Sequence, residues 1–147
     1  MNKKEQIRRI MVVSSCIQGI YMKWAKENDM KHNTLLLLYA LNDGKVHTQK
    51  SICEEWLIPK TTLNTIIKDC EKDGYITLRH ISGKKREMEI CLTEKGAEYE
   101  QKSTETVNAA EMRAISKALE KYGTDFITEM EYFSECLKEE LFESIER

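Results

Sequence analysis

Residues 48–93 decide the fold, and they read TQKSICEEWLIPKTTLNTIIKDCEKDGYITLRHISGKKREMEICLT. Apolar residues recur at helical spacing in two short segments, which Leu57-Ile58-Pro59 separates. A segment with alternating apolar residues follows, and the basic turn Ser82-Gly83-Lys84-Lys85-Arg86 interrupts it. A helix, a turn, a second helix and a basic hairpin, in that order, are typical of proteins that read DNA.

Both helices have clear boundaries. The first begins after Thr48, a good N-cap, and ends at Leu57-Ile58-Pro59. Pro59 also opens the second helix, because its fixed φ suits a first turn, and Asp73-Gly74 ends it. Each helix has one apolar face, formed by Ile52, Cys53 and Trp56 in the first and by Leu63, Ile66, Ile67 and Cys70 in the second.

The hairpin is predicted from a period of two in the apolar residues after residue 74. An antiparallel pairing about the Ser82-Gly83 turn places Leu78 opposite Met88. The same register places Ile76 opposite Ile90. Residues 79–86 then form an exposed tip, which contains four Lys/Arg residues and no acid.

Helical patterns flank this segment on both sides. We expect an amphipathic helix at about 4–27 and a largely buried helix at about 33–42. Thr93-Glu94 starts a long helix that breaks at Gly123, and a last amphipathic helix starts at Thr124-Asp125. The predicted fold class is mostly α: a winged helix-turn-helix with a β-hairpin wing and long N- and C-terminal dimerisation helices.

Length and composition agree with this class. The chain has 147 residues, of which 41% are hydrophobic and 33% charged, with one proline and six glycines, and such a composition favours long helices. We expect one domain, residues 1–147, with a DNA-binding core at about 30–97. The dimerisation helices are expected at about 1–28 and 98–147.

The formal net charge of −2 is unevenly distributed. Residues 1–58 carry nine Lys/Arg and six Asp/Glu, residues 59–97 eight and six, and residues 98–147 six and thirteen. A local basic face can bind phosphates when the acidic helices point away from the DNA. The total charge therefore neither supports nor excludes a nucleic-acid partner.

The sequence gives no sign of a metal, a cofactor, a catalytic centre or a membrane segment. The five cysteines are widely spaced without a Cys-x-x-Cys pair, and the three histidines have no ligand-like spacing with them. No nucleophile–base pair or phosphate loop is present, so we expect no enzyme. No apolar run approaches the ~18 residues of a membrane span. A cytoplasmic protein with reduced thiols is expected.

The apolar faces of the first and the last two helices require a partner. They lie outside the segment that packs around its own helices and hairpin, and exposed faces of that size favour association. A two-fold homodimer would set two reading helices roughly 34 Å apart, about one DNA turn, on an inverted repeat of double-stranded DNA.

The segment from the helix-turn-helix to the start of the next helix resembles a known family. Residues 47–76 (HTQKSICEEWLIPKTTLNTIIKDCEKDGYI), the hairpin and Leu92-Thr93-Glu94-Lys95-Gly96 occur in the motif order of the MarR (multiple antibiotic resistance regulator) family, over about residues 33–97. The resemblance implies a dimeric transcriptional regulator, usually a repressor. It also implies release from DNA by a small, often aromatic ligand or by cysteine oxidation.

The resemblance assigns the DNA-binding residues. The helix 59–73 would read the major groove and the wing 79–86 the minor groove and phosphates, because Asn pairs with adenine and Arg suits a narrow minor groove. The chain departs at Lys84, where the family usually has an aspartate two residues before the wing arginine. The predicted DNA-binding residues are Lys60, Thr61, Thr62, Asn64, Thr65, Lys68, Arg79, Lys84, Lys85 and Arg86.

Three alternatives stay open at this point. Tyr21, Trp24 and His32 are either core residues or the lining of a pocket for a small aromatic effector. Cys16 is either a small apolar residue at the dimer interface or a redox sensor, and Cys91, on the polar face of its strand, is the thiol expected to be exposed. The chain is either a DNA-binding regulator or a winged-helix module that binds proteins through its acidic last helix.

Overall fold

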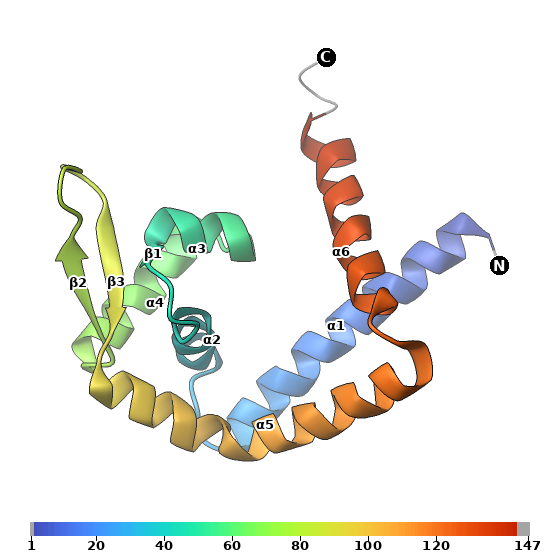
Figure 1. Cartoon of the computed structure of the whole chain (residues 1–147), viewed down its shortest axis with the longest axis horizontal. Coiled ribbons are helices and arrows are strands. Elements are labelled where there is room, and N and C mark those ends of the chain that lie inside the picture. Colours follow the sequence, from blue (N-terminus) through green and yellow to red (C-terminus); the bar gives the residue numbers. More distant parts are fainter. Residues whose placement is uncertain (1, 144–147) are drawn as a thin grey trace. The chain divides into compact units, whose positions relative to one another are not determined.

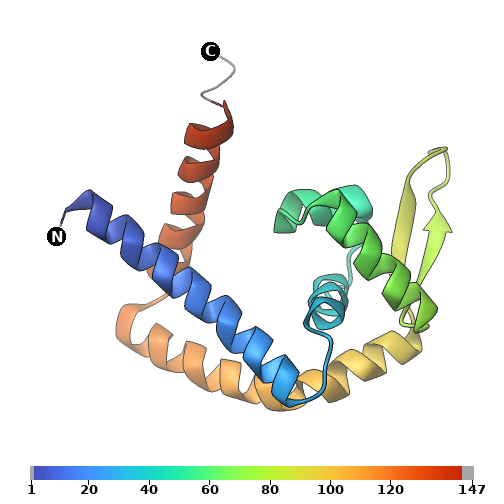
Figure 2. The ribbon, with the colours of Figure 1, turned by 180° about the vertical axis from the view of Figure 1, so that it is seen from behind.

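A computed structural model describes residues 2–143 of the chain. It confirms the mostly α class: six α-helices, a π-helical turn and a small three-stranded sheet (Figure 1; Figure 2 shows the same ribbon from behind). The elements are α1 (Lys3–Glu27), α2 (His32–Leu41), β1 (His47–Thr48), α3 (Gln49–Trp56), α4 (Lys60–Lys72), β2 (Ile76–His80), β3 (Met88–Leu92), α5 (Glu94–Tyr122), α6 (Asp125–Lys138) and the π-helical turn η1 (Glu139–Glu143).

The chain divides into two compact units, Met1–Ser103 and Thr104–Arg147. The first unit contains α1 to β3 and the start of α5, and the second contains the rest of α5, α6 and η1. The single domain that we expected stays a prediction. The outer ends of the predicted dimerisation segments, residue 1 and residues 144–147, lie outside the described residues.

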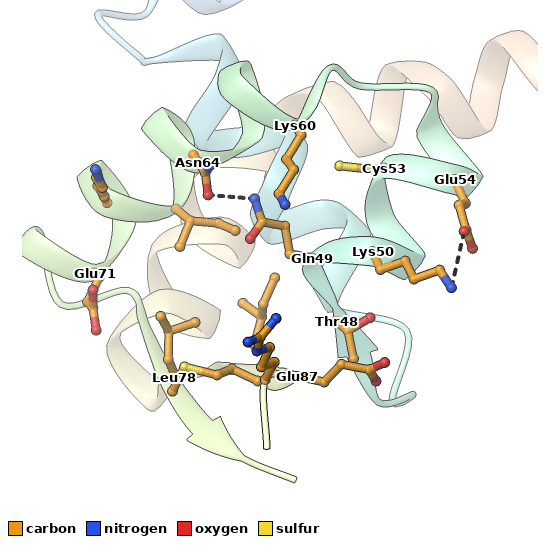
Figure 3. A pocket seen from close by; sticks show the side chains of 15 residues that line it. Thr48, Gln49, Lys50, Cys53, Glu54, Lys60, Asn64, Glu71, Leu78 and Glu87 are labelled. Carbon is orange, nitrogen blue, oxygen red and sulfur yellow. Dashed lines mark hydrogen bonds and ion pairs between the residues drawn. The ribbon is translucent and has the colours of Figure 1, made fainter. Parts of the chain in front are cut away.

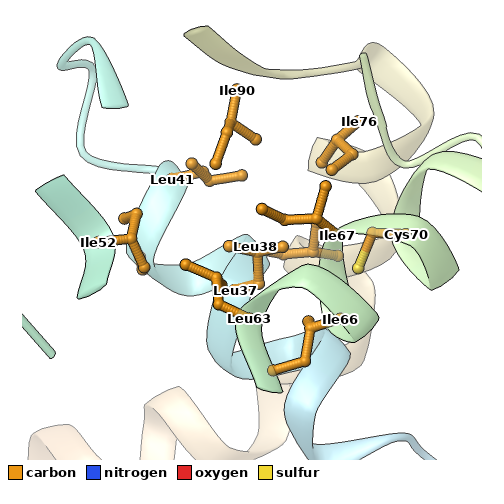
Figure 4. Packing of buried hydrophobic residues seen from close by; sticks show 11 residues of the cluster. Leu37, Leu38, Leu41, Ile52, Leu63, Ile66, Ile67, Cys70, Ile76 and Ile90 are labelled. Carbon is orange, nitrogen blue, oxygen red and sulfur yellow. The ribbon is translucent and has the colours of Figure 1, made fainter. Parts of the chain in front are cut away.

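The core of the first unit joins α2, α3, α4 and the hairpin (Figure 4). Leu38 from α2, Ile52 from α3 and Leu63 from α4 are fully buried there. Ile76 of β2 and Ile90 of β3 close the cluster from the hairpin side. Each buried Leu or Ile side chain stabilises the fold by about 1.5–3 kcal/mol, so these few contacts hold the two short helices and the hairpin together.

The junction of α3 and α4 follows the sequence signals closely. Thr48 caps α3 as predicted: its Oγ1 accepts the N–H of Ser51 at 3.1 Å, and the Ser51 Oγ accepts the N–H of Thr48 at 2.9 Å. The helix ends at Leu57, whose φ of 49° is left-handed. Pro59 is the N-cap of α4, so the first helical turn begins one residue later than we expected, at Lys60.

The register of the hairpin differs from the predicted one by two residues. Leu78 lies opposite Ile90, and Ile76 opposite Leu92, so the predicted pairs with Met88 and Ile90 are wrong. The turn is off-centre, because the Lys84 N–H donates to the Ile81 carbonyl at 3.1 Å and residues 84–87 lengthen the returning side. A shift of two leaves each side chain on its predicted face, which is why the core is as expected. The tip between the strands is residues 81–87.

The third strand, β1, was not expected from any pattern in the sequence. It pairs with β3, with His47 opposite Ile90 and Thr48 opposite Glu89. The His47 ring is buried, and its Nε2 lies 2.7 Å from Oδ1 of Asp43. β3 is therefore the central strand of the sheet.

The segment Leu92-Thr93-Glu94-Lys95-Gly96 joins the hairpin to α5. The Thr93 Oγ1 accepts the N–H of Gly96 at 3.0 Å, which confirms the predicted cap, and donates to the carbonyl of Gly74 at 2.8 Å. Gly96 packs directly on the backbone of Tyr75: a Cβ at Gly96 would lie 2.1 Å from the Tyr75 carbonyl oxygen. Only glycine fits this approach, so the motif fixes the start of α5 against Tyr75, the residue directly before β2.

Each unit has an exposed apolar surface. On α1 it comprises Ile7, Met11, Val12, Val13, Ile17, Ile20 and Met22, which are between 48% and 65% exposed. In the second unit it comprises Ile127, Met130, Tyr132, Leu137, Leu141 and Phe142. The N- and C-terminal helices are thus amphipathic as expected. Within residues 2–143, no helix has both the length and the apolar character needed to cross a membrane.

The cysteines are placed differently from the expectation in one respect. Cys16 on α1 is exposed, whereas Cys91 is half-buried, so the prediction that Cys91 is the exposed thiol is wrong. The reason is β1, which makes the strand of Cys91 central in the sheet. Cys70 lies in the core as predicted, and burial raises the pKa of its thiol, while Cys53 and Cys136 are half-buried.

Candidate nucleic-acid interface

α4 has one buried face and one polar face. Its core residues, Leu63, Ile66, Ile67 and Cys70, hold the helix against α2, α3 and β2. Lys60, Asn64 and Lys68 recur every four residues on the exposed side, and the predicted residues Thr61, Thr62 and Thr65 are exposed as well. The Thr65 hydroxyl donates to the Thr61 carbonyl at 3.2 Å, within the helix. The exposed residues are those that a reading helix needs: small, polar or cationic.

A groove of about 640 Å³ lies between the start of α3, the polar face of α4 and the hairpin (Figure 3). Its floor is apolar, formed by Ile67, Leu78, Met88 and Ile90. Its cationic side chains come from all three elements: Lys50 from α3, Lys60 and Lys68 from α4, and Arg86 from the tip. The structure therefore brings together four of the predicted residues, namely Lys60, Asn64, Lys68 and Arg86.

Carboxylates reduce the positive charge of this region. Glu54, Glu71 and Glu87 also line the groove, and Glu54 lies 3.8 Å from the ammonium of Lys50. In the described part of the chain, no ion pair involves Lys60, Lys68 or Arg86. Among the cations that line the groove, these three remain available for phosphates.

Two of the four predicted cations of the hairpin are engaged in ion pairs, and two are exposed. Arg79 lies in β2, and its Nε donates to the Glu89 carboxylate at 3.0 Å, which raises the pKa of Arg79. The Lys84 ammonium donates to Glu87 at 2.8 Å, and this bond lowers the pKa of the Glu87 carboxyl. Lys85 and Arg86 are exposed at the tip. The hairpin thus offers two cations to a phosphate backbone without breaking an existing ion pair.

Sequence reasoning missed the side chains that α3 brings to the groove. Gln49, the first residue of α3, donates from Nε2 to Oδ1 of Asn64 on α4 (Figure 3). The two residues are fifteen positions apart, so no local pattern connects them. The predicted cap at Thr48 was the one signal in the sequence that could have pointed to Gln49. A capped first turn beside a reading helix faces the same surface as that helix.

The three residues proposed for an effector are not part of this groove. Tyr21 and Trp24 lie three positions apart on α1, and His32 is the first residue of α2; all three are half-buried. Half-burial fits both a packing role and the lining of a pocket. Their role in ligand binding stays a prediction.

The fold and this groove define the class: a helix-turn-helix whose second helix has an exposed polar face, followed by a hairpin with a cationic tip, is a winged helix. Residues 28–87 match the model of the MarR family, so this segment is similar to the winged-helix proteins of that family. The resemblance seen in the sequence is thereby confirmed. No curated protein matches the chain.

Solved structures share the fold over most of the chain. NMB1585, a MarR family regulator from Neisseria meningitidis, is 24% identical with a TM-score of 0.79, over 98% of this chain and 99% of that one. A putative MarR family transcriptional regulator from Listeria monocytogenes, complexed with 26mer DNA, is 22% identical with a TM-score of 0.58, over 88% and 93%. NadR in complex with 4-hydroxyphenylacetate is 15% identical with a TM-score of 0.70, over 88% and 89%.

Proposed function

We propose that this chain is a cytoplasmic, homodimeric transcriptional repressor that binds an inverted-repeat operator. α4 enters the major groove, and the hairpin tip contacts the adjacent minor groove and phosphates. The observation that carries the proposal is the groove in which Lys60, Asn64 and Lys68 of α4 and Arg86 of the tip line one surface. The Listeria protein of similar fold was solved in complex with 26mer DNA, which supports DNA as the partner.

The side chains divide the work of recognition. Asn64 can pair with adenine through its carbonyl and its amide, and Thr61 can contact a base edge or a thymine methyl. Lys60, Lys68 and Lys85 suit phosphates, while Arg86 suits the negative potential of a narrow minor groove. These four side chains, which make eight in a dimer, predict a slope of log K against log salt of about −7.

Dimerisation follows from the apolar surfaces on α1 and in the second unit. A partner chain that covers them removes an association liability and sets the two α4 helices at a fixed separation. The half-sites would then lie about 10 base pairs apart, centre to centre. The strongly acidic residues 98–147 are repelled by the DNA backbone, so the C-terminal helices stay away from the DNA.

Regulation by a small aromatic ligand is part of the proposal. NadR was solved with 4-hydroxyphenylacetate, and the half-buried Tyr21, Trp24 and His32 of this chain offer aromatic surface and one titratable ring. A ligand that binds the DNA-free conformation more tightly than the bound one lowers operator affinity by the ratio of its two affinities.

Selection of genomic fragments by the protein, followed by gel shifts on the recovered sequences, tests the proposal. We expect an enriched inverted repeat and a steep dependence of affinity on salt. Arg86→Ala should lower the salt slope, whereas the matched variant Arg79→Ala should not, because Arg79 already pairs with Glu89. Failure to enrich any inverted repeat at moderate salt refutes the regulator and leaves the protein-binding module, which predicts weak DNA binding without sequence preference.

A further inference from the structure

We propose that Gln49 is a specificity-determining residue that acts through Asn64, by fixing which end of the Asn64 amide faces the DNA. The inference rests on the proposed function, because it requires that α4 reads bases. It assigns a role to a residue of α3, outside the reading helix. The contact that carries it is the hydrogen bond from Gln49 Nε2 to Asn64 Oδ1.

The two amides meet at the rim of the groove. Figure 3 shows the Gln49 side chain reaching from α3 toward Asn64 on α4, with the carbonyl oxygen of Asn64 turned toward the Gln49 nitrogen. Both side chains line the groove that also contains Lys60 and Arg86. The pair thus lies on the surface proposed to face DNA.

The backbone of Gln49 lies in the capped first turn of α3. It directly follows Thr48, whose side chain and backbone make three hydrogen bonds with Ser51, at 2.9, 3.1 and 2.9 Å. Its side chain is half-buried, whereas Asn64 is exposed. Gln49 is therefore the less exposed partner, on a backbone that the cap fixes, and Asn64 is the freer side chain of the two.

The orientation matters because an amide has two chemically opposite ends. An exposed asparagine can turn its carbonyl or its NH2 group toward a base edge, and adenine requires both in one order: the oxygen accepts from N6 and the nitrogen donates to N7. With Gln49 donating to Oδ1, the oxygen keeps a second lone pair and the Nδ2 group keeps both hydrogens. With the Gln49 amide in its observed orientation, a flipped Asn64 would place two NH2 groups against each other and lose the bond. One hydrogen bond of ordinary strength corresponds to about a fivefold preference for one orientation.

A purely structural role for the pair is a poor explanation. The packing of α3 on α4 is already held by Ile52 and Leu63, which are fully buried in the core. A hydrogen bond at the rim adds little to that packing. The effect of losing Gln49 should therefore appear in base preference rather than in the melting temperature.

A base-by-base preference profile of the full-length protein on its selected operator tests the inference. The variants are Gln49→Ala, Asn64→Ala and the double variant. We expect Gln49→Ala to lower discrimination about threefold to tenfold at the one position per half-site that Asn64→Ala also affects. The double variant should match Asn64→Ala, because Gln49 acts only through Asn64.

Two further variants sharpen the test. Gln49→Glu replaces the donor with an acceptor, so Nδ2 of Asn64 turns toward the carboxylate and the preferred base at that position changes. Lys50→Ala is the matched control from the same turn of α3, because Lys50 is paired with Glu54 and does not contact Asn64 through a hydrogen bond in the described structure. It should leave the base-preference profile unchanged.

The outcomes separate the inference from the proposed function. If the wild type selects an operator and Gln49→Ala keeps the wild-type profile, the inference is wrong and the regulator stands. A uniform loss of affinity in Gln49→Ala, or a changed profile in Lys50→Ala, also overturns it. If the wild type enriches no operator, the proposed function fails, and the role of Gln49 fails with it.

Discussion

Replacing Gly96 with alanine should destabilise the protein more than its position at the start of a helix suggests. A Cβ at this residue would lie 2.1 Å from the carbonyl oxygen of Tyr75, 2.9 Å from the carbonyl carbon and 3.0 Å from Cδ1 of Leu92. Two of these three atoms are backbone, which cannot move aside as a flexible side chain would. Relief of the clash therefore requires that α5 and the start of β2 separate.

The magnitude follows from three contributions. Forcing a methyl group into a closed contact costs about 3 kcal/mol at the upper end of the usual range. Moving the Tyr75 carbonyl also weakens its hydrogen bond from the Thr93 N–H, now 3.0 Å long, at about 1 kcal/mol. Alanine returns about 1 kcal/mol through its better helix propensity. The net loss is about 3 kcal/mol, which lowers the melting temperature by roughly 6–12 °C for a chain of this size.

Thermal unfolding followed by circular dichroism, at one fixed protein concentration, measures this difference. Gly19→Ala on α1 is the matched control, because nothing lies within 4 Å of a Cβ there and its backbone suits alanine. We expect that control to melt at or above the wild-type temperature. A Gly96→Ala protein that melts within about 2 °C of the wild type, where each kcal/mol corresponds to about 2–4 °C, would refute the close approach of α5 to Tyr75.

Three other predictions concern charge and capping. Glu87→Gln frees Lys84 from its 2.8 Å hydrogen bond, so the salt slope of DNA binding should steepen by up to about 0.9 per protomer. Fluorescence anisotropy at several salt concentrations measures this slope, and an unchanged slope means that Lys84 does not reach phosphate. Thr48→Ala removes the cap of α3 and should lower the free energy of unfolding by about 1 kcal/mol in urea titrations, whereas no change in the midpoint would show that β1 alone positions the helix. The hydrogen bonds from His47 and from the Lys45 N–H lower the pKa of Asp43 below its ordinary 3.8, so ionised Asp43 stabilises the fold above that pH and the contribution is lost as the pH falls through the lowered pKa. Asp43→Asn should therefore lose less stability than the wild type on acidification below pH 3.8, and equal losses in acid unfolding curves would contradict the role of the carboxylate.

The helices could be predicted because local signals agreed with tertiary packing. The cap at Thr48, the break at Pro59 and the glycines after α4 and α5 lie within one or two residues of the observed boundaries. The apolar faces of α3 and α4 lie in the core that their spacing predicted. The family resemblance over about residues 33–97 added the order of the elements, and the model of the MarR family matches residues 28–87, which overlap most of that segment.

The sheet could not be predicted to the same detail. β1 has two residues, too few for any periodic signal, and its partner β3 lies some forty positions later. The hairpin register depends on an off-centre turn, and the charge pairing depends on the register. In the predicted register Arg79 would face Glu87; in the observed one it faces Glu89, which leaves Glu87 for Lys84.

The candidate site was predicted in part for the same reason. Residues on one helix face, such as Lys60, Asn64 and Lys68, follow from a period of 3.6 and could be named from the sequence. Gln49 could not, because its contact with Asn64 depends on how α3 and α4 cross. Side chains that meet across two elements require the packing angle, which no local pattern contains.

Thr48 belongs to two elements at once, and this has a consequence for the energetics of an operator. Its backbone lies in β1 opposite Glu89 of the hairpin, and its side chain caps α3 one residue before Gln49. In a protomer bound to DNA, a hairpin that shifts to follow a different groove width also shifts the first turn of α3, and with it the amide beside Asn64. Base pairs under the hairpin and base pairs under α4 then contribute non-additively to the binding free energy, so a table of independent single-base preferences would misestimate the affinity of operators that differ at both places.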